Sequence, residues 1–409
     1  MWGELFGVNT GFEGADLDKI EDIGQLVDWL VTQDASFSSA IATRNALRIL
    51  PTAMAGVEQS FDSFEGADLL MLCLMLDLMS AVASTCSSID LRDVRSALQR
   101  FRANSTSEKA LLDATRISDS GGLSPFSAHS AGSSAASSVI FSGLGEKKGA
   151  AVFADGSSAH AFAPQMQAAS FADCQSIDAN GTTGVFNERL WPDGEGVQQV
   201  LALWHTFKAL PDPKGTWDFW RRWYRGMLEG QPLDWDLQLQ VALIGDDIWD
   251  SGPEAVAREI ARIEAKWELE REVVALKEQL AKVKQLEALP SRLHNQPPEA
   301  IDDTIGLFQT DVALIWDTLV ELEEEIEKPE PSPSRLKKIA EVLLGIAKKF
   351  TVYCAELGGI TAKKAAEEIG TTGTKWAIRG TAAFFTAENE GVQSVVKAIW
   401  EYAKTLPPG

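Results

Sequence analysis

Two long runs in the last third of the chain repeat apolar residues at alternating three- and four-residue steps. The first run is Ile305, Phe308, Val312, Ile315, Leu319, Leu322 and Ile326, and the second is Leu336, Ile339, Leu343, Ile346, Phe350, Tyr353 and Leu357. These steps are the spacing of the a and d positions of a heptad repeat. The prolines of KPEPSPS separate the runs, so we predict an antiparallel helical hairpin.

A third apolar seam precedes the hairpin, in a long helix predicted from Pro253 to Leu289. Its members are Leu269, Val273, Leu276, Leu280 and Val283. A heptad seam is not stable alone in water, so the hairpin must pack on this helix, on the N-terminal helices or on another copy of the chain. Leu319 and Leu343 are therefore candidate interaction residues, and the partner is the chain itself or another helical protein.

The N-terminal half is expected to form short helices. Its most apolar stretch, Leu69 to Ser84, is shorter than the roughly 20 residues of a membrane-spanning helix and contains Asp77, so a buried core helix is predicted. From Ser118 to about Ser170 the composition shifts to Ser, Ala and Gly, with Phe141 and Phe153 as apolar anchors. This composition suits a flexible linker or tightly packed helices, and we favour packed helices.

Eight of the thirteen tryptophans lie between residues 186 and 267. The segment KGTWDFWRRWYRGMLEG places Trp217, Trp220 and Tyr224 on one face of a helix that Gly230 ends. An aromatic face is either core or a binding platform, and aromatics at helical spacing are more often core. The three residues are nevertheless candidates for an interaction site.

The patterns together predict an all-α fold, a multi-helix bundle with a long coiled-coil-like helix and a C-terminal antiparallel helical hairpin. Five regions are expected: a helical head over 1–117, Ser/Ala/Gly-rich packed helices over 118–185, a Trp-rich helical module over 186–252, the long helix and heptad hairpin over 253–357, and a basic, small-residue-rich tail over 358–409.

Charge is distributed unevenly along the chain. The net charge of −22 argues against a nucleic-acid partner, which needs a basic face. From Arg335 onward, however, eleven basic residues exceed seven acidic ones. Candidate membrane-contact residues in this region are Lys348, Lys349, Lys363, Lys364, Trp376, Phe384 and Phe385. The alternative is that the lysines form the solvated face of a bundle, and the interleaved glutamates favour that alternative.

Catalytic and metal-binding patterns are weak. None of the serines lies in a G-x-S-x-G elbow, and GLGEKKG over 143–149 fails both phosphate-loop patterns. The four cysteines show no CxxC spacing, and the carboxylate run Glu323 to Glu325 is expected on an exposed helix face. We therefore expect no cofactor or metal and a non-enzymatic protein. An enzyme alternative would use Arg221, Arg222, His205 and Asp234 in the Trp-rich module.

Three segments carry a resemblance. LWPDG from Leu190, WDFWRRWYRGMLEGQPLDW from Trp217 and HNQPPE from His294 resemble an uncharacterised group of bacterial proteins with an Ala-rich helical N-terminal half, a Trp-rich module and an HNxPPE break. The resemblance covers about residues 130 to 300. It implies helix for the Ser/Ala-rich run, and it implies no catalytic residue.

The first twenty residues have neither a basic segment nor an apolar segment typical of a secretory signal. The expected location is therefore cytoplasmic, with the tail as a peripheral contact to the inner face of a membrane. The expected function is helical assembly, or a defence or toxin-like bacterial effector with a membrane-active tail. The alternatives are a scaffolding protein of a phage-like particle and the enzyme described above.

Overall fold

The computed structural model describes residues 23–59, 64–86, 92, 94, 125–158, 163–192, 197–287, 299–349 and 390–407. The described residues are mostly α-helical and contain no strand, which confirms the predicted all-α fold. They divide into two compact units, Met1–Ile260 and Ala261–Gly409. The first three predicted regions thus lie together in the first unit, and the long helix begins in it.

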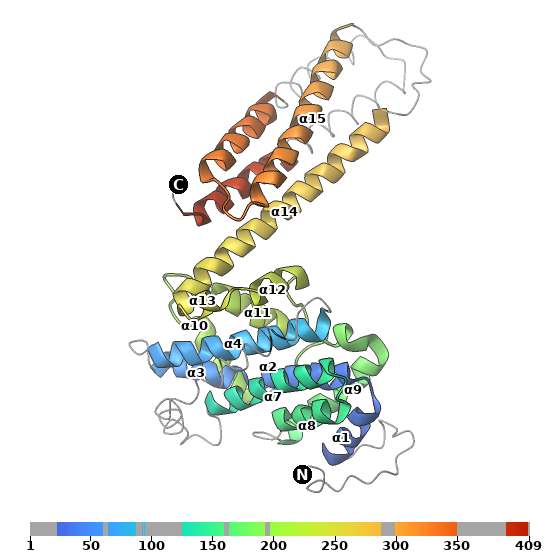
Figure 1. Cartoon of the computed structure of the whole chain (residues 1–409), viewed down its shortest axis with the longest axis vertical. Coiled ribbons are helices and arrows are strands. Elements are labelled where there is room, and N and C mark those ends of the chain that lie inside the picture. The colour runs from blue at the N-terminus through green and yellow to red at the C-terminus, as the bar shows by residue number, and fades with distance from the viewer. Residues whose placement is uncertain are drawn as a thin grey trace, which may run out of the picture. The chain divides into compact units, whose positions relative to one another are not determined.

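The first unit contains one long apolar helix, α4, which packs against several of its other helices (Figure 1). The bounds are α1 Ile23–Thr32, α2 Ala35–Ile49, α3 Pro51–Gln59, α4 Phe64–Thr85, α7 Pro125–Gly143, α8 Lys147–Ser158, α9 Ala163–Val185, α10 Gln198–Ala209, α11 Asp218–Glu229, α12 Trp235–Ala242 and α13 Asp246–Trp249. Helix α4 contacts α2, α3, α7, α9 and α12. Nearly every side chain from Leu70 to Val82 is consequently buried.

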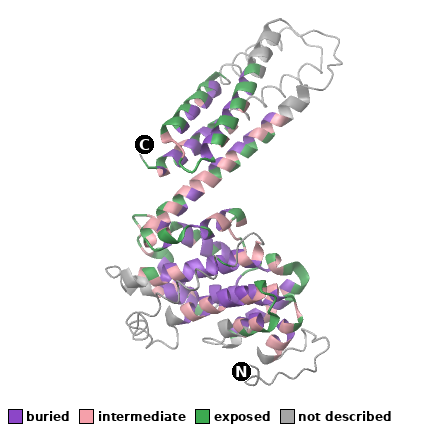
Figure 2. Ribbon diagram, viewed as in Figure 1, coloured by how far each residue is buried: buried purple, intermediate pink, exposed green. Residues whose placement is uncertain are grey.

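By length and composition, Ala67–Thr85 is one stretch in the described part of the chain that is apolar enough to cross a membrane, and most of it is buried. The predicted core helix over Leu69 to Ser84 is therefore confirmed as a buried helix (Figure 2).

Small residues allow the helices around α4 to approach one another closely. A Cβ atom built on Gly149 of α8 would lie 2.5 Å from Phe141 Cδ1, and one on Gly132 of α7 would lie 3.8 Å from Leu76 Cβ. The ring of Phe141 stacks on Phe153 with 5.4 Å between centroids. The Ser/Ala/Gly-rich segment therefore forms packed helices in its described parts, as predicted.

The second unit packs four helical segments around a shared apolar core, counting only the described residues. They are α14 (Pro253–Glu287) from Ala261 onward, α15 (Glu299–Ile326), residues 333–349 and residues 390–405. Its buried side chains include Leu269, Val273, Leu276, Leu280, Val312, Ile315, Leu319, Leu322, Ile326, Leu336, Ile339, Leu343 and Ile346. The seam residues from Leu269 to Leu280, from Val312 to Ile326 and from Leu336 to Ile346 thus lie in one core.

Ion pairs show that α15 and the helix 333–349 run antiparallel. Near the turn, Arg335 Nη2 lies 3.1 Å from Glu321 Oε1, and at the other end Lys349 Nζ lies 3.0 Å from Asp311 Oδ1. Leu319 and Leu343 are fully buried between these helices. They are covered within their own chain and offer no exposed surface to a partner.

The prediction that Glu325 lies on an exposed face was wrong. Its side chain is 1% exposed, because it accepts a 2.7 Å hydrogen bond from the backbone N–H of Ser332 and pairs with Lys328 and Arg335. Burial alone would raise the pKa of Glu325, but the hydrogen bonds from Lys328 and Ser332 lower it overall. This carboxylate joins the two ends of the turn.

One part of the predicted tail, residues 390–405, forms a helix of this core. Its apolar side, with Val392, Val395, Ile399 and Tyr402, is fully buried. A Cβ atom built on Gly391 would lie 3.1 Å from Leu276 Cδ1, so this helix lies against α14 at short range.

Among the candidate membrane-contact residues, Lys348 is exposed and Lys349 pairs with Asp311. Lys363, Lys364, Trp376, Phe384 and Phe385 lie outside the described residues.

Candidate functional site

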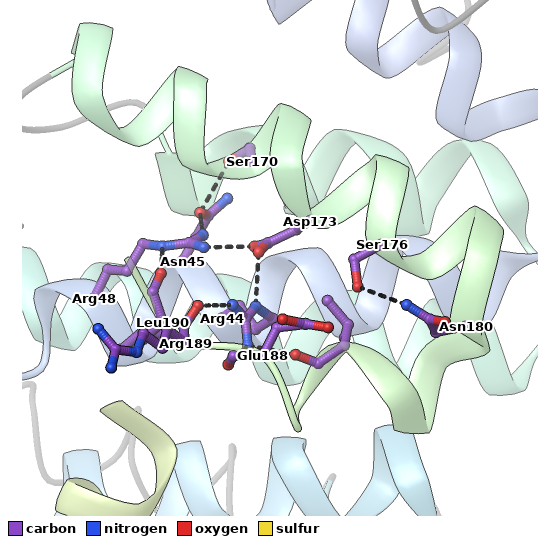
Figure 3. Close-up of polar contacts among 11 residues, drawn as sticks. Arg44, Asn45, Arg48, Ser170, Asp173, Ser176, Asn180, Glu188, Arg189 and Leu190 are labelled. Carbon is purple, nitrogen blue, oxygen red and sulfur yellow. Dashed lines mark hydrogen bonds and ion pairs between the residues drawn. The ribbon is translucent and has the colours of Figure 1, made fainter. Parts of the chain in front are cut away.

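Two arginines of α2 form the centre of a buried polar cluster in the first unit (Figure 3). Arg44 and Arg48 lie four residues apart, so they extend from the same face of the helix. Their side chains are 1% and 0% exposed. Removing charged groups from water is costly unless each is paired and hydrogen-bonded, so their partners decide whether this unit is stable.

Asp173 of α9 supplies the negative charge for both arginines. Its Oδ1 lies 2.9 Å from Arg44 Nε, and its Oδ2 lies 2.7 Å from Arg48 Nη2. Asn45 adds a neutral acceptor, because its Oδ1 takes a 2.8 Å hydrogen bond from Arg48 Nη1 and a 3.0 Å hydrogen bond from Ser170 Oγ. Helices α2 and α9 are thus joined by charge and by hydrogen bonds.

The remaining guanidinium nitrogens donate to backbone oxygens at and just after the end of α9. The acceptors are the carbonyl oxygens of Val185, Glu188, Arg189 and Leu190, at 2.7, 3.2, 2.8 and 2.8 Å. Gly181, with a φ of 75°, kinks α9 just before these residues. Every guanidinium nitrogen of both arginines therefore has an oxygen within 3.2 Å.

These carbonyl oxygens stabilise the excess positive charge of the cluster through their dipoles. Two arginines face a single carboxylate, and the carbonyl oxygens at a helix C-terminus carry partial negative charge. Burial lowers the pKa of Arg48 to about 10, with Asp173 acting in the opposite direction. Arg48 is therefore still cationic at neutral pH.

The Trp-rich helices hold the other side of the same backbone segment. The N–H of Leu190 donates a 3.1 Å hydrogen bond to the carbonyl oxygen of Leu228. Gly230, which ends α11 with a φ of 69°, packs so closely that a Cβ atom would lie 2.8 Å or less from the backbone of residues 187–189. We call residues 185–191 the clamped segment, because it lies between the α2 arginines and the end of α11.

A second buried carboxyl lies in α4. Asp77 is 1% exposed, and its Oδ1 has no hydrogen-bond partner among the described residues. A Cβ atom on Gly132 of α7 would lie 3.1 Å from this oxygen, which is closer than an ordinary contact, so a larger residue there would require the carboxyl to shift. Burial raises the pKa of Asp77 well above its ordinary value of 3.8. Burial also raises the pKa of Tyr224, and Asp77 adds to that effect.

The aromatic residues singled out from the sequence lie in the core. Trp217, Trp220 and Tyr224 are all buried, and the Tyr224 ring meets Trp204 edge-on with centroids 4.9 Å apart. Trp220 likewise meets Trp223 at 5.7 Å. These side chains have the core role that their helical spacing favoured, and they present no exposed face to a partner.

The polar groups of the enzyme alternative have separate surroundings. Arg221 donates 3.2 and 2.8 Å hydrogen bonds to the carbonyl oxygens of Phe207 and Leu210 at the end of α10. Asp234 accepts hydrogen bonds from the first N–H groups of α12 and caps that helix. His205 and Arg222 are exposed. Arg221 and Asp234 thus have structural roles at helix ends.

The sequence predictions missed the arginine cluster, although it left a signal. Between Ala35 and Val57 the only charged residues are Arg44 and Arg48, and between Gly156 and Ile177 the only one is Asp173. Isolated charges within uncharged, small-residue helices indicate buried pairs. Comparison with protein-family models, curated proteins and solved structures finds no match to this chain.

Replacing Asp173 by Asn should strongly destabilise the first unit. The variant leaves two buried cations without a carboxylate, and loss of one partner of a buried ion pair typically costs about 3–5 kcal/mol. The free energy of unfolding, measured in urea, tests this expectation. Asp178→Asn is the matched control, because Asp178 is an exposed carboxylate of the same helix. Equal stability of the two variants would contradict the assigned role of Asp173.

Replacing Asp77 by Asn should change how stability depends on pH. Because the folded-state pKa is raised, the wild-type carboxyl is protonated in the folded state and ionised in the unfolded state above about pH 3.8. Its contribution to stability is fully present below that pH and falls by about 1.4 kcal/mol for each pH unit until the folded pKa is reached. Urea unfolding between pH 4 and pH 8 should therefore show a smaller decline for the variant. If the free energy of unfolding declined equally with pH in the wild type and the variant, the raised pKa of Asp77 would be contradicted.

Proposed function

We propose that this chain is a non-enzymatic helical assembly protein whose C-terminal unit binds other helical surfaces. The observation that carries the proposal is the outer surface of the helical hairpin. Although the heptad seams are buried inside the unit, Leu314, Val320 and Val342 are 43%, 38% and 45% exposed. These apolar side chains stand among charged residues on the outside, a combination common at protein interfaces.

In this proposal the first unit is a stably folded part of the chain whose polar cluster and aromatic residues serve its own packing. The charged groups of its arginine cluster are all engaged in joining helices, and the Trp-rich module uses its aromatic residues as core.

Sedimentation velocity of the full chain over a range of concentrations tests the assembly function. We expect a mass that rises above the 44.4 kDa of one chain as concentration increases. Leu314→Ser should weaken the association, because it removes exposed apolar area, whereas Ala313→Ser on the same exposed side should not. A chain that stays at the monomer mass at every concentration, without and with a cellular extract, would refute the function.

A second candidate is an effector whose tail acts on anionic membranes. It is favoured by the helix 390–405, whose apolar side is covered by the bundle while Lys397 and Lys404 are exposed. An amphipathic helix with an apolar face and exposed lysines suits a membrane surface once it is released. The bundle would then hold the tail inactive until a trigger opens it.

Leu276→Asp tests the effector candidate, because it places a charge in the core beside Gly391 without altering the tail. We expect the variant to release dye from vesicles that contain anionic lipid, and the wild-type chain to leave them intact. Ala275→Asp is the control, since Ala275 is exposed on the same helix. If limited proteolysis shows the tail helix detached and the vesicles still do not leak, the effector candidate is wrong.

A further inference from the structure

The outer side of the helix 333–349 carries a stripe with positive charge at both ends. Lys338, Val342, Gly345 and Lys348 follow one another at steps of four, three and three residues, and all four are exposed. They therefore lie along one side of the helix. Neither lysine of this basic stripe makes an ion pair in the described part of the chain.

The outer side of α15 and the turn after it carries a stripe of opposite charge. Asp317, Val320, Glu324 and Glu327 follow at steps of three, four and three residues and are also exposed. The backbone N–H of Glu327 still bonds to the carbonyl oxygen of Glu323, so the helical path continues to this residue. The three carboxylates of this acidic stripe are likewise without an ion pair among the described residues.

The two stripes match in length and in order. Lys338 and Lys348 are ten residues apart, as are Asp317 and Glu327, which corresponds to about 15 Å along an α-helix. Each stripe has an exposed valine between its charged ends. A helix carrying one stripe therefore meets a helix carrying the other with charge against opposite charge and valine against an apolar surface.

We infer that the acidic stripe of one copy of this chain docks on the basic stripe of a second copy. This inference rests on the proposed assembly function and names its partner and its surfaces. Because the stripes are different surfaces of one chain, the contact is head-to-tail, and each docked copy keeps one stripe for the next. The product is a ring when the rotation closes and a filament when it does not.

Gly345 lies in the middle of the basic stripe and lets the partner helix come close. A Cβ atom built at Gly345 has no heavy atom within 4 Å, so the surface there is open and carries no side chain. With the two helices parallel, Val320 of the second copy lies opposite Val342, and the missing side chain at Gly345 shortens the distance between the packed helices. Two oppositely charged ends then fix the register.

Other anionic partners fit the basic stripe less well than a second copy. Glu341 lies on the same exposed side of the helix, so this side is not the purely basic surface that an anionic membrane or a nucleic acid requires. The acidic stripe, in contrast, is the complement of the basic one in charge, length and position of its valine.

Two variants of the full chain, in which charged side chains are replaced by neutral ones, test the docking. Lys338→Gln with Lys348→Gln removes the basic ends, and Asp317→Asn with Glu324→Gln removes two acidic charges. Each variant alone should associate at least about tenfold more weakly than wild type at low salt, since its stripe has lost the steering and register charges. Lys397→Gln with Lys404→Gln is the matched control on an exposed side of the same unit, and it should associate like the wild-type chain.

Mixing the two variants distinguishes this contact from any other association. Each variant keeps the stripe that the other has lost, so one native contact forms between them and growth stops at a 1:1 heterodimer, measured by sedimentation velocity. A wild-type chain that associates while both variants associate equally well would refute the stripes and leave the assembly function standing. A wild-type chain that is monomeric alone would refute the docking between copies, and one that also stays at the monomer mass in a cellular extract would refute the assembly function as well.

Discussion

The first unit depends on the pairing of two buried cations with one carboxylate and one helix end. Arg44 and Arg48 place two positive charges where water does not reach, and Asp173 neutralises only part of that charge. The carbonyl oxygens from Val185 to Leu190 complete the coordination. The arginines are therefore stable only when the clamped segment is in place, and this requirement couples α2 to the end of α9 and to the Trp-rich helices that hold the segment from its other side.

The same requirement explains why regions far apart in the sequence form one unit. Residues 44 and 48 come from the predicted head, Asp173 from the Ser/Ala/Gly-rich region, and Leu228 and Gly230 from the Trp-rich module. Small residues also permit short distances between other helices of this unit, as at Gly132 between α7 and α4 and at Gly149 between α8 and α7. Asp77 makes the stability of this core depend on pH, because its burial favours the protonated form of the carboxyl.

Much of the helical architecture could be predicted from periodicity, because alternating three- and four-residue steps report directly which side of a helix is apolar. The seams from Leu269 to Leu280 and from Val312 to Ile326, which periodicity identified as apolar sides, are buried. The position of Glu325 could not be predicted, since its burial depends on a backbone N–H across a turn. The isolated charges of Arg44, Arg48 and Asp173 indicated a buried pair, but the backbone oxygens about 140 residues away that complete it could not be predicted, because backbone groups leave no mark in the sequence.

We propose that the arginine cluster makes the first unit a single cooperative body, and that the outer stripes of the second unit hold copies of the chain together. Hydrogen–deuterium exchange of the Arg44→Gln variant measures directly whether the segments of the first unit open together. We expect α2, the clamped segment and the end of α11 to lose protection together, because all three depend on the same buried contacts. Faster exchange confined to α2, with the N–H of Leu190 as protected as in the wild-type chain, would contradict it.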